Sequence, residues 1–120
     1  MKKKFRIKKS DEIQQLMIKK NTVGNSYFVL YHQKNHDSKN FRFAISVSKK
    51  YGKAFERNLM KRRIREVVKV NDFSDDSEFF VVAKIKSKEL DFSGVKMNIE
   101  DLFKKANLLK ERVKWKQKVK

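Results

Sequence analysis

Three sequence patterns follow one another in residues 41–83, and their order limits the folds that this chain can adopt. Residues 41–48 (FRFAISVS) alternate between apolar and polar or small side chains, which predicts a strand with one face on a core. Residues 54–70 place apolar side chains at helical spacing, and residues 79–83 (FFVVA) form the apolar run typical of a central strand. A helix between two such strands predicts a parallel pair, whose crossover is right-handed by default.

Three further segments complete the expected fold. Residues 10–20 predict a short helix capped by Ser10, residues 27–31 (YFVLY) predict a strand, and residues 32–40 predict a polar turn. A last helix is expected to begin around 94–98. The apolar helix positions are Ile13, Leu16 and Met17, then Leu102, Phe103, Ala106 and Leu109. The order α-β-β-α-β-α predicts an α+β fold, in which a small mixed β-sheet packs against helices as an α-β sandwich.

The charge of the chain is concentrated in three regions. Its 120 residues include 32 Lys and Arg against 14 Asp and Glu, a formal net charge of +18. The basic excess lies in residues 1–10, 49–69 and 104–120. Such a field attracts polyanions, and nucleic acid is the most frequent polyanionic partner of a small basic protein.

The length favours one domain over residues 1–120. We expect a basic N-terminal arm at 1–9 and a basic C-terminal tail at 110–120, and the sequence leaves open whether that tail is ordered. No apolar run approaches the roughly 18 residues of a membrane span, and none follows the charged N-terminus as in a secretory signal. We therefore expect a soluble, cytoplasmic protein without a membrane partner.

Several kinds of chemistry do not fit the sequence. The chain has no cysteine, which excludes disulfide scaffolds, thiolate catalysis and cysteine-ligated metal sites. His32 and His36 fall at a strand end and in a turn, so the helical geometry of a paired histidine metal site is not expected. An acidic segment typical of a solvated connector contains Asp72, Asp75, Asp76 and Glu78. We predict no catalytic residue and no metal-ligating residue.

Residues 54–70 separate an apolar stripe from a basic arc on a helical wheel. The stripe consists of Met60, Ile64, Val67 and Val68. The arc consists of Arg57, Asn58, Lys61, Arg62, Arg65 and Lys69. The stripe can pack on the sheet while the arc faces outward.

This basic arc costs stability in the free protein. Arg57, Lys61 and Arg65 lie four residues apart, where like charges repel one another. Three lysines precede the positive end of the helix dipole, and they are Lys49, Lys50 and Lys53. A polyanion removes both costs, so the pattern favours a nucleic-acid-binding surface over an ordinary solvated helix face.

The same region carries a specific series of motifs. SVSKK at 46–50 is followed by Gly52, Ala54, RN at 57–58, KR at 61–62 and IR at 64–65. This series resembles the signature of the bacterial ribonuclease P protein subunit. The similarity extends to RIKK at 6–9, FVLY at 28–31 and residues 79–84, and it weakens after about residue 86.

The resemblance implies a non-catalytic, RNA-binding subunit that joins a large catalytic RNA. The complex of this family hydrolyses precursor tRNA to free the mature 5′ end, with Mg²⁺ held mainly by the RNA, and no further protein partner is implied. It also implies a left-handed β-α-β crossover, against the default above. The arginine-rich helix would dock on the catalytic RNA, and a cleft between the first helix and an open sheet face would bind the single-stranded 5′ leader.

The resemblance assigns residues to both surfaces. The basic ridge would consist of Lys49, Lys50, Lys53, Arg57, Asn58, Lys61, Arg62 and Arg65. The leader cleft would consist of Ile13, Met17, Tyr31, Ser46 and Ser48. The residues themselves agree with the second role, because small side chains at 44, 46 and 48 let a backbone approach the sheet. Tyr27, Val29 and Tyr31 are expected to share one face of a strand.

This chain departs from the family pattern at three points. Leu59 stands where the family helix often carries Arg or Lys, so one cation is lost. Ile13 and Met17 hold the places of two aromatics on the first helix, and we expect apolar packing there rather than ring stacking. Lys53 stands where the family often has Asn, so a helix cap is given up.

Alternatives to this interpretation remain open on the sequence. Tyr27 and Tyr31 could simply pack on the sheet or cover its edge. A general RNA-binding ribosomal or assembly protein could use the same ridge without recognising a leader. A helix-turn-helix DNA-binding protein fits poorly, because the basic helix lies between two strands.

Overall fold

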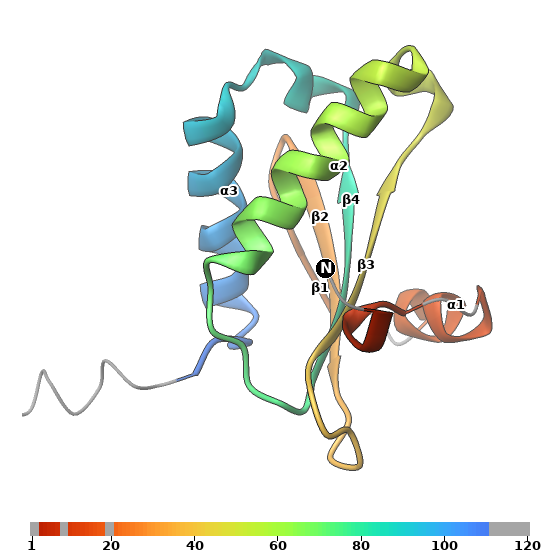
Figure 1. Cartoon of the computed structure of the whole chain (residues 1–120), viewed down its shortest axis with the longest axis vertical. Helices are drawn as coiled ribbons and strands as arrows, with labels where there is room; N and C mark the ends of the chain where they lie inside the picture. The colour runs from red at the N-terminus through yellow and green to blue at the C-terminus, as the bar shows by residue number, and fades with distance from the viewer. Residues whose placement is uncertain (1–2, 8–9, 19–20, 111–120) are drawn as a thin grey trace, which may run out of the picture.

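Four strands form one mixed sheet in the computed structural model, which describes residues 3–7, 10–18 and 21–110. The sheet order is β1-β2-β4-β3 (Figure 1). The strands are β1 (Thr22–Gly24), β2 (Phe28–Lys34), β3 (Arg42–Val47) and β4 (Ser77–Ala83). β4 pairs antiparallel with β2 and parallel with β3, which confirms the predicted parallel pair and the central strand.

The sheet differs from the prediction at its N-terminal end. β1 was not expected, because three residues are too few to show an alternating pattern. β1 and β2 form a hairpin whose turn is fixed by the Asn25 side chain, which accepts hydrogen bonds from the N–H groups of Tyr27 and Phe28 at 2.8 and 2.9 Å. β2 also continues through Lys34, into residues predicted to form a turn, because they pair with β4.

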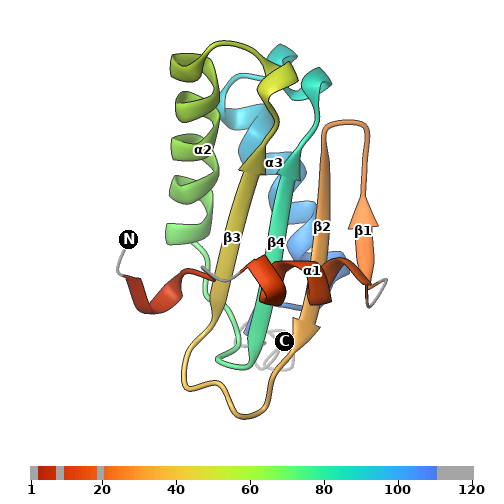
Figure 2. The same cartoon turned by 90° about the vertical axis from the view of Figure 1, so that its right-hand side faces the viewer.

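Helices cover the two faces of the sheet unequally. α2 (Ala54–Lys69) and α3 (Phe92–Lys105) lie on one face, and α1 (Ser10–Ile18) crosses β2 and β4 on the other (Figure 2). Short 3-10 helices span Lys3–Phe5, Lys49–Tyr51 and Ile85–Glu89. α2 connects the parallel strands, and the left-handed crossover implied by the resemblance stays a prediction. None of the described helices is long and apolar enough to cross a membrane.

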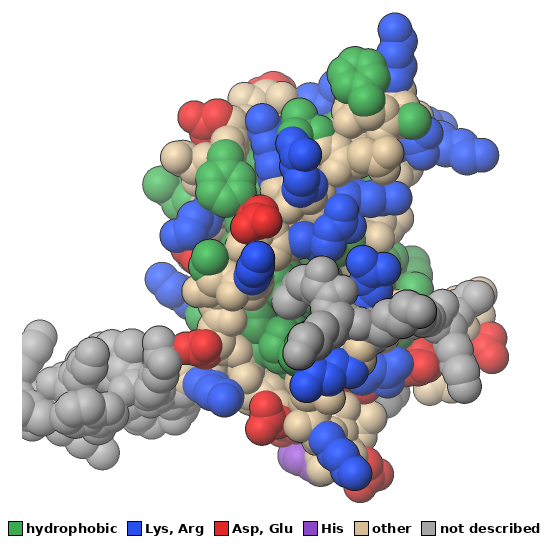
Figure 3. All heavy atoms as spheres, viewed as in Figure 1, with side chains coloured by type: hydrophobic (Ala, Val, Ile, Leu, Met, Phe, Trp, Pro, Cys, Tyr) green, Lys and Arg blue, Asp and Glu red, His purple; other side chains and the backbone are tan. Residues whose placement is uncertain are grey.

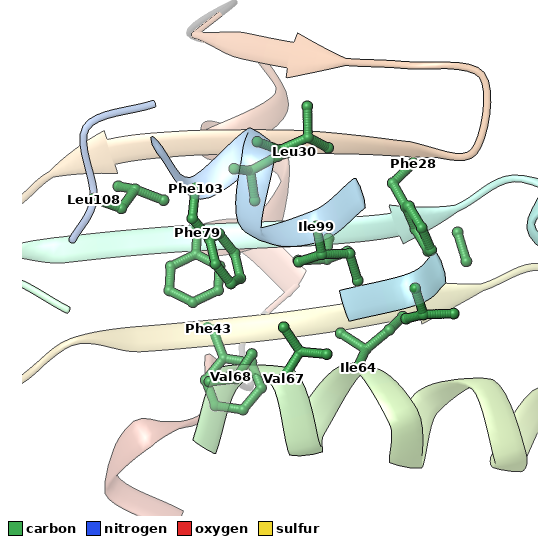
Figure 4. Close-up of a cluster of buried hydrophobic side chains, with 14 of the residues drawn as sticks. Phe28, Leu30, Phe43, Ile64, Val67, Val68, Phe79, Ile99, Phe103 and Leu108 are labelled. Atoms are coloured by element: carbon green, nitrogen blue, oxygen red, sulfur yellow. The ribbon is translucent and has the colours of Figure 1, made fainter. Parts of the chain in front are cut away.

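The main core lies between the sheet and the α2–α3 layer (Figure 4). The predicted stripe of α2 is buried as expected, with Met60, Ile64, Val67 and Val68 each exposed by no more than 1%. Phe73, Phe79 and Phe103 meet beneath it, with ring centroids 4.8 to 5.3 Å apart. This burial fixes which side of α2 faces outward.

α3 begins slightly earlier and ends earlier than the periodicity indicates. The Asp91 side chain caps its first turn by accepting a hydrogen bond from the Gly94 N–H at 2.8 Å. Asn107 has a positive φ of 57°, a left-handed conformation that ends helices. The prediction that Leu109 belongs to this helix is therefore wrong, and Leu109 instead forms a bridge with Phe73.

Parts of two predictions fall beyond the described chain. The arm predicted at 1–9 is described at 3–7, and the tail predicted at 110–120 is described only at Lys110. The side chains of Ser10 and Leu16 also lie outside the described set, so the predicted cap of α1 stays a prediction.

Candidate nucleic-acid interface

The outward face of α2 presents the predicted basic ridge. Lys49, Lys50 and Lys53 are exposed before the helix, Asn58 and Arg62 are exposed on it, and Arg57, Lys61 and Arg65 are partly exposed. Figure 3 shows Lys and Arg side chains gathered over α2. Among the residues that the structure describes, no ridge cation forms an ion pair, and Arg57 donates a hydrogen bond to the Gly52 carbonyl, at 3.2 Å. The ridge charge is therefore not compensated by described carboxylates.

The start of α2 compensates for the missing cap. Lys53 occupies the N-cap position, and its ammonium has no acceptor to offer. Glu56, one turn on, accepts the Lys53 N–H at 2.9 Å, and Lys88 lies 3.5 Å from the same carboxylate group. The backbone hydrogen bond from Lys53, with the charge of Lys88, lowers the pKa of Glu56. This acid therefore serves the helix terminus, where it also interacts with the charge of Lys53.

One aromatic side chain beside the ridge is not among the residues predicted from the sequence. Phe55 is 69% exposed, and its ring shares a shallow hollow with Asn58, Leu59, Arg62 and Arg65. On the helical wheel Phe55 falls next to Arg62, so the sequence alone could have predicted that Phe55 borders the basic arc. An exposed ring beside cations is a surface on which a nucleic-acid base can stack.

The open face of the sheet carries most of the predicted leader cleft. Two cross-strand rows lie there, Tyr31–Phe80–Ala44 and Val29–Val82–Ser46. Ile13 of α1 and Tyr31 pack against the buried pair Ile7 and Phe80. The Tyr31 ring stacks on Phe80 with centroids 6.0 Å apart. The structure therefore brings Ile13 and Tyr31 into one apolar cluster.

The other predicted cleft residues are not part of this cluster. Met17 is 44% exposed on α1, Ser46 is partly exposed in the row next to Ala44, and Ser48 is exposed after β3. The sequence predicts that Tyr27 shares a strand face with Val29 and Tyr31, but Tyr27 precedes β2 in a bend and packs against the main core instead. The expectation for Tyr27 is wrong because the strand alternation begins one residue later.

A polar network fixes α1 across the sheet. Arg42 of β3 donates two hydrogen bonds to Glu12 of α1, at 2.7 and 3.2 Å, and a longer one of 3.4 Å to Glu78. These contacts raise the pKa of Arg42, with the Glu12 hydrogen bond as the largest cause. Glu78 is only 3% exposed and also accepts from Gln33 and Asn35, at 2.6 and 3.2 Å.

Glu78 corrects one sequence interpretation. The acidic pattern at 72–78 favours a solvated connector, but Glu78 lies inside β4 and faces the α1 side of the sheet. The signal that could have identified it is its position next to the apolar run 79–83, because a central strand extends beyond its purely apolar residues. Its buried carboxylate is tolerated because three side chains donate to it.

The two histidines lie in different surroundings. His32 lies in β2, and burial together with nearby Lys34 lowers its pKa. His36 is exposed and lies 3.5 Å from Asp76. Within the described ranges, no three His, Asp or Glu side chains cluster closely enough to hold a metal ion.

Comparison with known proteins places these features in a family. The family model described as ribonuclease P matches residues 1–107. The ribonuclease P protein component of Phytoplasma australiense is 41% identical over 111 residues, covering 91% of this chain and 96% of that protein. The corresponding component of Streptococcus equi subsp. equi (strain 4047) is 39% identical over 112 residues, covering 92% and 93%.

Solved structures of RNase P proteins have the same fold as this chain. The Staphylococcus aureus RNase P protein superposes with a TM-score of 0.82 at 34% identity, covering 88% of this chain and 98% of that one. The Thermotoga maritima protein superposes with a TM-score of 0.75 at 28% identity, covering 83% of this chain and 96% of that one.

One assignment follows from the motif series at 46–65, from the mixed sheet with its basic crossover helix, and from these matches. This chain belongs to the ribonuclease P protein family.

Proposed function

We propose that this chain is the non-catalytic protein subunit of ribonuclease P, which binds the catalytic RNA and assists removal of the 5′ leader from precursor tRNA. Family membership makes it a component of an RNA-containing endoribonuclease that processes tRNA. The observation that carries the proposal is the basic ridge, whose cations lack described acidic partners. In this proposal residues 1–120 act as one RNA-binding domain.

The ridge is suited to a structured RNA backbone. Arginine guanidinium groups donate two parallel hydrogen bonds to phosphate oxygens, and the ridge places them on a rigid 16-residue helix. Binding releases the counterions that the phosphates had condensed, and it also relieves the repulsion between Arg57, Lys61 and Arg65. Phe55 adds an exposed ring for a neighbouring unstacked base.

The residues assigned to the leader cleft are suited to contact with a single strand. Ile13, Tyr31 and the exposed Met17 offer apolar contact, and Ser46 and Ser48 leave room for a sugar-phosphate backbone. Without the family's paired rings on α1, these contacts lack much of the roughly 1–3 kcal/mol that stacking gives per base. We therefore propose leader binding through apolar packing of modest strength.

The reaction chemistry belongs to the RNA in this proposal. The Mg²⁺ needed for hydrolysis would be held mainly by the catalytic RNA, where it would supply an activated water and charge stabilisation. The chain contributes charge neutralisation and positioning of the leader, and we assign catalytic residues to no protein side chain.

Reconstitution tests the proposal. Protein free of RNA is incubated with precursor tRNA at low Mg²⁺, with and without the cognate catalytic RNA. Cleavage at the mature 5′ end should require the RNA and should be strongly increased when this protein is added to it. Cleavage by the protein alone would overturn the division of roles.

A general RNA-binding protein is the second candidate. It is favoured by the partial burial of Ile13 and Tyr31 within the Ile7–Phe80 cluster, which is what a purely structural role for these side chains requires. Precursors with and without a 5′ leader distinguish the two candidates. Tighter holoenzyme binding to the leader-bearing precursor supports leader recognition, whereas equal affinity supports the general RNA-binding role.

A further inference from the structure

A hollow at the outer edge of β3 is lined by residues of both surfaces proposed above. It has a volume of about 280 Å³, and it is bounded by the N-terminal segment, α1, β3 and α2. Its apolar wall includes Ile13, Ala44 and Ile45. Its charged rim consists of Arg6, Lys61 and Arg65. The hollow therefore joins the basic ridge, through Lys61 and Arg65, to the leader cleft, through Ile13.

The N-terminal segment is anchored at this place by its own contacts. The Ile7 N–H donates to the Phe43 carbonyl at 2.8 Å, and Arg6 forms a parallel bridge with Phe43. The Ile7 side chain is only 5% exposed because it packs with Phe80 under α1. These contacts hold the exposed Arg6 at the mouth of the hollow, although Arg6 is far from α2 in sequence.

The charges around the hollow are not compensated within it. None of its lining residues is acidic, and among described residues Arg6, Lys61 and Arg65 form no ion pair or side-chain hydrogen bond. Three cations that share one partly apolar hollow repel one another more strongly than cations separated by bulk water. A bound anion would convert this repulsion into attraction.

We propose that this hollow binds one nucleotide of single-stranded RNA. The phosphate is held by Arg6, Lys61 and Arg65, and the ribose and base lie against Ile13, Ala44 and Ile45. The volume is close to the lower end of small-ligand pockets, about 300 Å³, which suits a single nucleotide. The inference rests on the proposed RNA-binding function, and it adds Arg6 as a contact outside both assigned surfaces.

Binding to the free chain is the first test. The protein is titrated with adenosine 5′-monophosphate, inorganic phosphate and adenosine, and the backbone amide NMR signals of Ile7, Ala44 and Ile45 are followed. The nucleotide should shift these signals at lower concentration than either part alone. Arg6→Ala should weaken nucleotide binding about tenfold, the loss of one charge-assisted hydrogen bond, while Lys104→Ala on exposed α3 should not change it.

A second variant separates the pocket from simple charge attraction. Ala44→Val keeps every cation but fills part of the apolar wall, so it should weaken nucleotide binding without weakening phosphate binding. A thermal unfolding curve checks that the variant is folded. Equal loss of nucleotide and phosphate binding in folded Ala44→Val, or no effect of Arg6→Ala, would overturn the inference.

The source of the nucleotide is distinguished in the holoenzyme. If the leader supplies it, Arg6→Ala should weaken binding of leader-bearing precursor and leave mature tRNA unaffected. If the catalytic RNA supplies it, Arg6→Ala should weaken the protein–RNA complex itself. Should Arg6→Ala behave as Lys104→Ala while Arg57→Ala still weakens RNA binding, the pocket fails and the proposed function stands. Should Arg57→Ala also have no effect, the proposed function fails.

Discussion

The Lys and Arg side chains of this chain include some with described acidic partners and some without. Ridge cations such as Arg62 lie on an exposed helix face without described acidic partners, whereas Arg42 is tied to Glu12 and Glu78 on the sheet. A cation that is already paired gains little free energy from binding a phosphate, because its existing hydrogen bonds must first be broken. The unpaired cations are therefore those expected to contact RNA.

Leu59 offers a gain-of-binding prediction. It is 37% exposed within the hollow that Phe55, Asn58, Arg62 and Arg65 line. Leu59→Arg should steepen the slope of log affinity against log salt by about 0.7–0.9, because one more phosphate is neutralised. The measurement is a titration of the catalytic RNA at several KCl concentrations. Met97→Arg, at a 72% exposed position on α3, is the matched control, and an equal effect of both variants would contradict the prediction.

His32 predicts a pH dependence of stability. Burial, with the charge of Lys34, lowers its pKa below the ordinary value of 6.5, so the folded state binds this proton less readily than the unfolded chain does. As pH falls below about 6.5, the unfolded chain takes up the proton first, and the free energy of unfolding decreases until the folded pKa is reached. His32→Gln should lose this component. Urea unfolding between about pH 7 and pH 5 measures it, and a wild-type-minus-variant difference that does not change with pH would contradict it.

At the scale of elements, the number of residues in a periodic pattern determined which helices and strands could be predicted from the sequence. α2 was predicted with its buried stripe and its exposed face, because 16 residues sample the helical period several times. β1 was missed because three residues carry no period. Glu78 was misplaced although it adjoins the apolar run 79–83, because the partners that stabilise its buried carboxylate, here Gln33 and Arg42, are distant in sequence. The hollow at β3 depends on Arg6, which only the fold brings to α2.

The placement of α1 depends on the Arg42 network and gives a third prediction. Arg42→Ala leaves Glu78 with fewer donors in a buried position, so it should lower the free energy of unfolding by about 1–3 kcal/mol. It should also reduce discrimination for leader-bearing precursor, because Ile13 is no longer held beside Tyr31. Urea unfolding and precursor binding measure the two effects.

An exposed ion pair on α3 provides the control for Arg42. Lys105 and Asp101 lie 3.2 Å apart with side chains more than half exposed, so Lys105→Ala should cost less than about 1 kcal/mol. An equal loss of stability in the two variants would show that the Arg42 network does not hold α1 in place.

In the whole molecule, the residues that pack the core and the residues proposed to bind RNA lie on different surfaces of the layers. α2 and α3 bury one sheet face, and α1 crosses the other without covering all of it (Figure 2). The ridge helix and the cleft residues therefore lie on different sides of one sheet, and residues of both line the hollow at the edge of β3. A net charge of +18 attracts polyanions at long range, and in the proposed function the cations without described acidic partners determine where the RNA binds.

The salt dependence of binding to the catalytic RNA tests this account most directly. The triple variant Arg57→Gln, Lys61→Gln, Arg65→Gln is compared with a charge-matched variant on α3, Lys96→Gln, Lys104→Gln, Lys105→Gln. The ridge variant should flatten the slope of log affinity against log KCl by about two units, at about 0.7 for each phosphate that is no longer neutralised, and the α3 variant should leave it unchanged. An unchanged slope in the ridge variant, or equal flattening in both, would contradict RNA binding by the α2 ridge.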